Sequence, residues 1–172
     1  NVRKMIALRA PAVEGLPGGH AHDFFAAWLA HGTGGTCWPS SNALYELVRF
    51  AGFTAERIAG NMRDLGVVNH ASVRVSVQGG DWLVDSSMLT NQPLPLGDAI
   101  FVSDDAVVPA EVEQDLGAHV CWFSMAPSPE PFPCRLEPDA VDHAFYLKGY
   151  EASRERSVFN QRLYARRNHP CE

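Results

Sequence analysis

The chain has 172 residues, and 46% of them are hydrophobic, which suits one globular domain with a substantial core and excludes a largely disordered protein. The formal net charge is −6, and the 14 Lys and Arg residues are spread out apart from a small cluster at Arg162, Arg166 and Arg167 that we interpret as a solvated face. This balance argues against a nucleic-acid partner, which would need a basic face. No apolar run reaches the length of about 18 residues that a membrane-spanning helix needs, so no membrane partner is expected.

The cysteines indicate the redox setting and the absence of a metal centre. The sequence contains Cys37, Cys121, Cys134 and Cys171, with no Cys-x-x-Cys pair and no spacing typical of a disulfide framework. A structural zinc site is therefore not expected. No signal peptide is visible at the beginning of the sequence. These features together predict a reducing, cytoplasmic setting.

The first part of the chain is expected to be helical. Phe24–Leu29 predicts a short helix, and the glycines that follow it interrupt regular structure. A second helix is predicted from about Pro39 to Ala51, because apolar residues recur there at helical spacing and form one buried stripe. Pro39 suits the first turn of this helix, and Gly52 suits its end.

A β-hairpin is predicted after this helix. Phe53–Gly60 is expected to form a strand, and Ala71–Val77 alternates between valines and polar residues, as a half-buried strand does. Gln78–Asp81 is a turn signal, and Trp82–Asp85 begins the return strand. A two-residue loop at Gln78-Gly79 or at Gly79-Gly80 would put His70 and Asp85 on the same face of the hairpin. The first of these loops pairs Ser72 with Asp85 and leaves His70 one diagonal step away.

The pattern weakens after the hairpin. Gly97–Val108 is weakly strand-like, Ala118–Met125 predicts a strand, and the prolines of Pro127–Pro133 predict a loop. Leu136–Tyr150 is mixed, and Phe159–Arg166 resembles a last strand. A helical region of about residues 20–52 followed by a β-region of about residues 53–172 predicts a single α+β domain over residues 1–172.

Cys37 is the first candidate for chemistry. It lies at the start of the predicted helix, directly after two glycines and Thr36. Free backbone N–H groups and the helix dipole favour a thiolate there, and the thiolate is the nucleophilic form. The same kind of N–H groups, near Gly35 and Trp38, can hold an oxyanion. A buried, inert cysteine is the alternative, and Cys37 taken alone favours that alternative.

His70 and Asp85 complete a candidate triad. His70 can act as a base for Cys37, and Asp85 can orient the imidazole ring. Alone, His70 is more often a capping or surface histidine, and Asp85 is more often a strand-end carboxylate. The three residues in this order and context favour a Cys-His-Asp triad. Trp38 and Trp82 either line an aromatic acceptor pocket or pack in the core, and Ser86, directly after Asp85, is a further candidate for substrate binding.

Two other groups of residues are not expected to form sites. His20, His22 and His31 fall in a glycine-rich stretch with no carboxylate at fixed spacing, so we interpret them as loop histidines and predict no metal. The stretch from Gly32 to Gly35 lacks the Gly-Lys-Ser/Thr of a phosphate-binding loop, so nucleotide binding there is not expected.

These motifs resemble the arylamine N-acetyltransferases, within the transglutaminase-like or papain-like superfamily of cysteine enzymes. The family carries Arg-Gly-Gly-x-Cys followed by an aromatic residue, matched here by 34–38 (GGTCW), then a His before an apolar strand, matched by His70, and a Leu-Val-Asp at the end of the next strand, matched by 83–85. The segment 159–163 is weakly similar to a later part of the family. Thr33 stands in place of the family's Arg, Pro39 in place of its acidic or amide residue, and 86–89 (SSML) in place of Val-Gly-Phe-Gly.

The resemblance implies a fold and an activity. The fold would be a papain-like or transglutaminase-like core, in which an N-terminal helix carrying Cys37 packs on an antiparallel sheet or partial barrel. The family's N-terminal helical bundle and its C-terminal domain are expected to be largely absent. Cys37 would take an acetyl group from acetyl-CoA, with no bound cofactor, and pass it to an amine such as an arylamine. A transglutaminase-like amidase, peptidase or amide synthase with the same triad is the alternative, and an inactive binding module is a second one.

Overall fold

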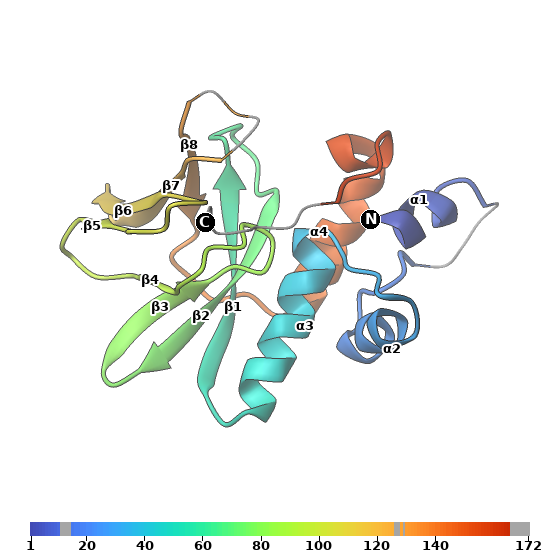
Figure 1. Cartoon of the computed structure of the whole chain (residues 1–172), viewed down its shortest axis with the longest axis horizontal. Helices are drawn as coiled ribbons and strands as arrows, with labels where there is room; N and C mark the ends of the chain where they lie inside the picture. Colours follow the sequence, from blue (N-terminus) through green and yellow to red (C-terminus); the bar gives the residue numbers. More distant parts are fainter. Residues whose placement is uncertain (11–14, 126–127, 129, 166–172) are drawn as a thin grey trace.

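The computed structural model describes residues 1–10, 15–125, 128 and 130–165 of the chain. This part of the chain combines helices with one antiparallel sheet, so the predicted α+β class is confirmed. The helices gather on one side of the molecule, and the sheet occupies the other (Figure 1). The helices are α1 (Val2–Ala7), α2 (Ala21–His31), α3 (Cys37–Phe50), α4 (His143–Arg156) and the short 3-10 helix η1 (Val158–Asn160).

The sheet has eight strands, in the order β4-β3-β2-β1-β8-β7-β6-β5. The strands are β1 (Thr54–Met62), β2 (His70–Val77), β3 (Gly80–Val84), β4 (Leu94–Pro95), β5 (Phe101–Val102), β6 (Ala110–Asp115), β7 (Ala118–Phe123) and β8 (Phe132–Leu136). The two edge strands, β4 and β5, follow each other along the chain. The loops beside them are joined where the Asn91 N–H donates to Asp105 Oδ2 at 2.8 Å. The sheet therefore curls into a nearly closed partial barrel.

Helix α3 positions the candidate nucleophile, and it begins two residues earlier than the sequence predicts. It runs from Cys37 to Phe50, so Cys37 is its first residue. The predicted stop at Gly52 is confirmed: Gly52 has φ +93°, its N–H donates to Arg49 O, and the Phe53 N–H donates to Val48 O. This pair of bonds is the Schellman motif, in which a glycine adopts the left-handed conformation after the last helical turn.

Both faces of the sheet are covered. On one face, α3 packs its apolar stripe on β1 and β2, where Leu44 and Val48 contact Val73 and Val75. A larger cluster fills the other, concave face of the sheet. Its buried members come from β1, β3, β4 and β6–β8 and from the loops between them: Ile58, Leu83, Met88, Leu94, Val108, Ala110, Val112, Cys121, Phe123, Phe132, Cys134 and Leu136. This packing holds the ends of β2 and β3 in place beside the start of α3.

The structure corrects several predicted elements. The helix predicted over Phe24–Leu29 is longer, as α2 shows, and the strand predicted over Gly97–Val108 is reduced to β5. The sequence gives no definite element over Leu136–Tyr150, where it is mixed, whereas helix α4 begins there at His143. The prediction of a last strand over Phe159–Arg166 is wrong as far as residue 165, because η1 and irregular chain lie there. Arg166 itself, like Arg167 and Cys171, lies outside the described residues.

Strand β8 is not predicted from the sequence, because prolines lie in it and directly before it. The sequence predicts a loop through Pro133, yet β8 begins at Phe132 and pairs Pro133 with Trp122 of β7. Strand β8 pairs with β1 only through residues 134–136. Pro133 precedes this paired stretch, so its missing N–H removes no hydrogen bond between β8 and β1. Its carbonyl oxygen still accepts a hydrogen bond from the Arg63 N–H.

Candidate active site

The hairpin of β2 and β3 has one of the two expected registers. Val77 pairs with Gly80, so Gln78 and Gly79 form a two-residue loop. Both loop residues have positive φ, +53° and +81°, as a type I′ turn requires. Val73 pairs with Val84, and the next position along each strand brings Ser72 opposite Asp85. His70 therefore lies one diagonal step from Asp85, at the beginning of β2.

His70 and Asp85 form a buried hydrogen-bonded pair. His70 Nε2 lies 2.6 Å from Asp85 Oδ2, and the two side chains are 5% and 2% exposed. Burial alone would lower the pKa of His70, but the charge and hydrogen bond of Asp85, together with Cys37, raise it to about 10. Burial alone would raise the pKa of Asp85, but the charge and hydrogen bond of His70, with further hydrogen bonds, hold it well below its ordinary value. Both shifts favour the form of the pair in which the ring is an imidazolium and Asp85 a carboxylate.

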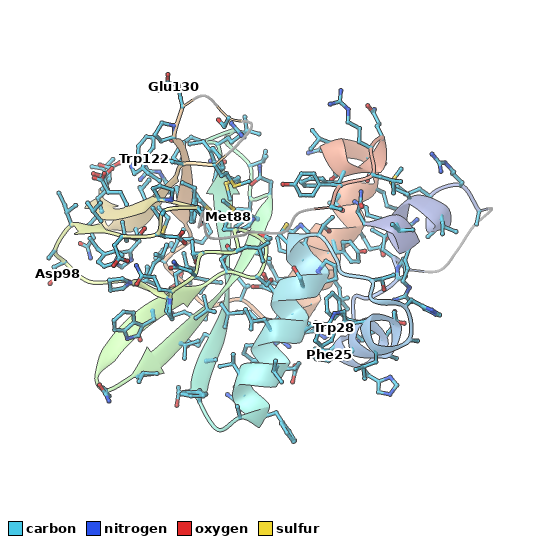
Figure 2. The ribbon with its side chains drawn as sticks, viewed as in Figure 1. Phe25, Trp28, Met88, Asp98, Trp122 and Glu130 are labelled. Atoms are coloured by element: carbon cyan, nitrogen blue, oxygen red, sulfur yellow. The ribbon has the colours of Figure 1, made fainter. Side chains whose placement is uncertain are left out.

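Asp85 is anchored by hydrogen bonds on both carboxylate oxygens. Oδ2 accepts from Ser72 Oγ as well as from His70. Oδ1 accepts from the Ser87 N–H and Oγ, both at 2.8 Å, and from the Met88 N–H at 2.9 Å. The Met88 side chain, labelled in Figure 2, is buried in the cluster that fills the concave face of the sheet. Sequence reasoning missed Ser72 and Ser87; the pairing of Ser72 with Asp85 in the expected register was the available signal.

Cys37 lies at the first position of α3 and is half-buried, and it contributes to the raised pKa of His70. Because His70 Nε2 is bound to Asp85, the other ring nitrogen, Nδ1, is the one left for Cys37. Cys37 Sγ also lies 3.8 Å from the carbonyl oxygen of Asn69. The Asn69 side chain in turn holds the end of β1, through hydrogen bonds to the backbone of Met62. Asn69 is a second residue near the site that sequence reasoning missed.

The N-terminal end of α3 leaves backbone donors available. Thr36 occupies the N-cap position, but its side chain makes no capping hydrogen bond. Among the described residues, the backbone N–H groups of Cys37 and Trp38 have no acceptor. Pro39, the third residue of the helix, has no N–H to satisfy. Two donors therefore remain beside the Cys37 thiol, where an oxyanion would need them.

Gly35 and the Trp38 side chain are both tightly packed. A Cβ on Gly35 would come within 2.8 Å of Pro39 and 2.9 Å of Phe24, so only glycine allows α2 and the start of α3 to approach this closely. The Trp38 side chain is buried, with its ring 5.4 Å from that of Tyr146 in α4. Of the two interpretations of Trp38, core packing fits this buried position. The Trp38 backbone N–H remains a candidate oxyanion donor.

The other tryptophan and serine candidates are also located. Trp82 is half-buried in β3, and its Nε1 lies 3.5 Å from the Cβ position of Gly80, toward the hairpin turn and away from Asp85. Ser86 is half-buried, and its Oγ lies 3.0 Å from Ser40 Oγ and 3.4 Å from Ser41 Oγ. Ser86 thus joins the loop after Asp85 to the first turn of α3.

The other described cysteines differ from Cys37. Cys121 and Cys134 are free and buried, and they pair directly across β7 and β8. Burial raises the pKa of Cys121 to about 12 and that of Cys134 well above its ordinary value. Both remain thiols at neutral pH, so neither competes with Cys37 as a nucleophile.

Lys4 of α1 is a cation that sequence reasoning missed. It is 2% exposed, and its Nζ donates to Ser153 O and Oγ in α4. Burial lowers the pKa of Lys4 to about 8, although attraction to Cys37 works in the opposite direction.

The histidines near the N-terminus do not form a metal centre in the structure. The described part of the chain contains no group of three or more His, Cys, Asp or Glu side chains placed to hold a metal ion. His20 stacks edge-on against His143, with ring centroids 5.0 Å apart, while His22 and His31 lie in α2 rather than in a loop. None of the helices in the described residues is long and apolar enough to cross a membrane.

Comparison with known proteins identifies the fold. No protein-family model and no curated protein sequence matches the chain. Solved structures do match. An arylamine N-acetyltransferase from Salmonella typhimurium matches with a TM-score of 0.70 at 16% identity, over 91% of this chain and 59% of the other. One from Mycobacterium marinum in complex with CoA matches with a TM-score of 0.69 at 17% identity, over 88% and 58%.

A third match comes from another species. An arylamine N-acetyltransferase from Bacillus cereus, described as having a Cys-His-Glu catalytic triad, matches with a TM-score of 0.69 at 13% identity, over 82% of this chain and 60% of the other. The chain thus spans somewhat more than half the length of these three structures. At these identities the likeness concerns the three-dimensional fold. The chain has the papain-like α+β fold of the arylamine N-acetyltransferases.

Proposed function

We propose that the protein is an acyltransferase that moves an acetyl group from acetyl-CoA, through a thioester on Cys37, to an amine acceptor such as an arylamine. The observation that carries this proposal is the position of His70, which is hydrogen-bonded to buried Asp85 through Nε2 and follows Asn69, whose carbonyl oxygen lies 3.8 Å from Cys37 Sγ. A thiol, an imidazole and a carboxylate in this order are the groups that covalent acyl transfer needs.

In the first step, the Cys37 thiolate attacks the carbonyl carbon of the acyl thioester. The oxyanion that forms accepts hydrogen bonds from the backbone N–H groups of Cys37 and Trp38. The intermediate then collapses, the bond to the CoA sulfur breaks, and the CoA thiolate takes the proton that His70 carries. The acyl group is left on Cys37, and His70 is left neutral.

In the second step, the amine nitrogen attacks the acyl carbon on Cys37. Neutral His70 accepts the proton from the attacking nitrogen, a carbon–nitrogen bond forms, and the carbon–sulfur bond breaks. Cys37 leaves as a thiolate beside the protonated imidazole, which restores the starting state. Asp85 stabilises the protonated ring and holds its orientation throughout.

Structural relatives support the choice of donor. One arylamine N-acetyltransferase of the same fold has been solved with CoA, and another is described as having a Cys-His-Glu triad, in which a carboxylate also accompanies Cys and His. The free cysteines Cys37, Cys121 and Cys134 suit a reducing, cytoplasmic setting. We take small molecules, an acyl-CoA and an amine, to be the partners.

Intact mass spectrometry after incubation with acetyl-CoA tests the proposal. The expected result is one added acetyl group, which is absent from Cys37→Ala and removed when an arylamine such as aniline is added. Acetylation that survives in Cys37→Ala would overturn the assignment of the nucleophile. No acetylation of the wild type would overturn the acyl-CoA donor. Acylation by an amide or ester, followed by hydrolysis that added amine does not accelerate, would instead indicate an amidase or peptidase.

A further inference from the structure

Asp85 Oδ2 is shared between two buried donors, and this sharing concerns the proposed base directly. His70 Nε2 and Ser72 Oγ both bind this one oxygen, at 2.6 and 2.5 Å. Ser72 is 1% exposed, so no bulk water competes for its hydroxyl. Its Oγ has no other hydrogen-bond partner in the described part of the chain, and its backbone carbonyl is held by the Tyr146 hydroxyl from α4. The hydroxyl is therefore committed to the carboxylate.

We propose that Ser72 is a positioning residue that weakens the hold of Asp85 on the His70 proton, so that His70 can become a neutral base once Cys37 carries an acyl group. This inference rests on the proposed function and deepens it. A hydrogen bond donated to a carboxylate disperses its negative charge and makes it a weaker acceptor for its other partner. Ser72 thus limits how strongly Asp85 stabilises the imidazolium.

The need for such a limit follows from the two steps. In the resting enzyme, a protonated His70 beside the Cys37 thiolate is useful, because the ion pair is the nucleophilic state. In the acyl-enzyme the thiolate is gone, and only Asp85 still favours a protonated ring. A ring held too strongly as imidazolium cannot accept the proton of the attacking amine. Ser72 acts on this second step, transfer to the amine, and much less on the first.

The other ionisable groups around the pair do not replace Ser72. Cys121, Cys134 and Tyr146 face Asp85 from β7, β8 and α4, but burial raises the pKa of each, and they remain uncharged at neutral pH. Lys4 of α1 interacts with Cys37, and Arg57 of β1 with Tyr146. The charges that His70 itself feels are those of Asp85 and Cys37.

The chain offers a matched control on the same carboxylate. Ser87 Oγ donates to Asp85 at 2.8 Å, but to Oδ1, which His70 does not use. Oδ1 keeps two backbone donors, from Ser87 and Met88, when the Ser87 hydroxyl is removed. Ser103 is a second control: it is buried, and its Oγ accepts from the Ala110 N–H far from the triad. Ser103→Ala measures the loss of a buried hydroxyl as such.

The first experiment separates the two half-reactions across a pH series. Rapid mixing with p-nitrophenyl acetate follows acylation as a burst of p-nitrophenolate, and discharge of the acetylated protein to aniline follows transfer. For Ser72→Ala, we expect the rising limb of the transfer rate to move up by about 0.5–1 pH unit. Transfer at a pH below this limb should slow by about three- to tenfold, while the acylation burst changes less than about twofold. Ser87→Ala should give a smaller shift, and Ser103→Ala none.

A second measurement does not depend on turnover. NMR titration of the His70 imidazole in the Cys37→Ala background reports its protonation without a thiolate neighbour. Adding Ser72→Ala should raise the titration midpoint, and adding Ser72→Thr, which keeps the hydroxyl, should restore it. An unchanged or lower midpoint in Ser72→Ala would overturn the inference, as would equal slowing of acylation and transfer without a shift in pH dependence. Absence of any acylation of the wild type would instead count against the proposed function.

Discussion

Gly149 of α4 lies directly against the indole ring of Trp38, and a Cβ at this position would come within 2.6 Å of Trp38 Cη2. Trp38 follows the candidate nucleophile by one residue, so this contact packs α4 against the first turn of α3. Its ring also lies at a tilt to that of Phe145, with centroids 6.5 Å apart. The close approach of the two helices depends on the missing side chain of Gly149.

Gly149→Ala is therefore expected to destabilise the protein, although alanine is the better helix former. The gain in helix propensity is about 1 kcal/mol, whereas forcing an extra carbon into a packed interface typically costs about 1–3 kcal/mol. We expect a net fall in the free energy of unfolding, measured by urea denaturation. Gly97→Ala is the control, because its Cβ would meet no atom within 4 Å. Equal stability of Gly149→Ala and wild type would mean that the two helices are less tightly packed.

Selective alkylation should identify Cys37 among the described cysteines. With a limiting amount of iodoacetamide near neutral pH, we expect the label on Cys37, because Cys121 and Cys134 are buried thiols whose pKa burial raises. Peptide mapping locates the label. Replacing Cys37 with Ser should abolish the fast phase, whereas Cys121→Ser should leave it intact. Preferential labelling of Cys121 or Cys134 in the folded protein would contradict the assignment.

Asp85→Asn should show whether the negative charge of Asp85 is needed, because the substitution keeps the size of the side chain. The amide keeps the shape but loses the charge that stabilises protonated His70, so we expect the acylation rate of Cys37 to fall by at least about 10²-fold. The NH2 group of the amide cannot accept the hydrogen bonds that a carboxylate oxygen of Asp85 accepts. Because buried donors then lose their acceptor, we expect a loss of about 1–3 kcal/mol in the free energy of unfolding. Rates must be compared at a temperature where the variant is folded. Near-normal acylation by folded Asp85→Asn would show that Asp85 is only a strand-end residue.

The stability of the protein should depend on pH through the His70–Asp85 pair. Because folding raises the pKa of His70 from 6.5 to about 10, its stabilisation is complete below pH 6.5 and is lost as the pH rises through about 10. Folding lowers the pKa of Asp85 below 3.8, so its stabilisation is present above that pH and is lost on acidification. The pair should therefore contribute most between these two ordinary values, from about pH 4 to 6.5.

Comparing wild type with Asp85→Asn separates the pH dependence of the His70–Asp85 pair from that of Lys4. Folding lowers the pKa of Lys4 from 10.5 to about 8, so its contribution works in the opposite direction and increases stability between those values. Urea unfolding of wild type and Asp85→Asn over the same alkaline range cancels the Lys4 contribution, which both proteins share. We expect the difference in stability between them to shrink as the pH approaches about 10. A difference independent of pH would show that the two side chains do not titrate as a pair.

Local signals in the sequence were sufficient for the hairpin and for the helix that carries Cys37. The alternation in β2 and the turn signal leave two registers, and the observed one, with its loop at Gln78-Gly79, brings Ser72 opposite Asp85 with His70 one step away. The apolar stripe of α3 and the glycine after it define where that helix ends. These features depend on residues close together in the chain, so periodicity and turn chemistry determine them.

Only the tertiary structure decided the elements whose stability comes from distant contacts. Helix α4 contains Gly149 and many polar residues and shows no clear apolar stripe, because its packing relies on Trp38, Tyr146 and Tyr150 rather than on a periodic face. Strand β8 is held by β1 and β7 despite its proline. Lys4 approaches the site from α1, a segment far from Cys37, His70 and Asp85 in the chain. The sequence by itself determined the hairpin and the helix that present Cys37, His70 and Asp85, since local rules govern both. What surrounds and tunes them came from packing between residues far apart in the chain, which no local pattern encodes.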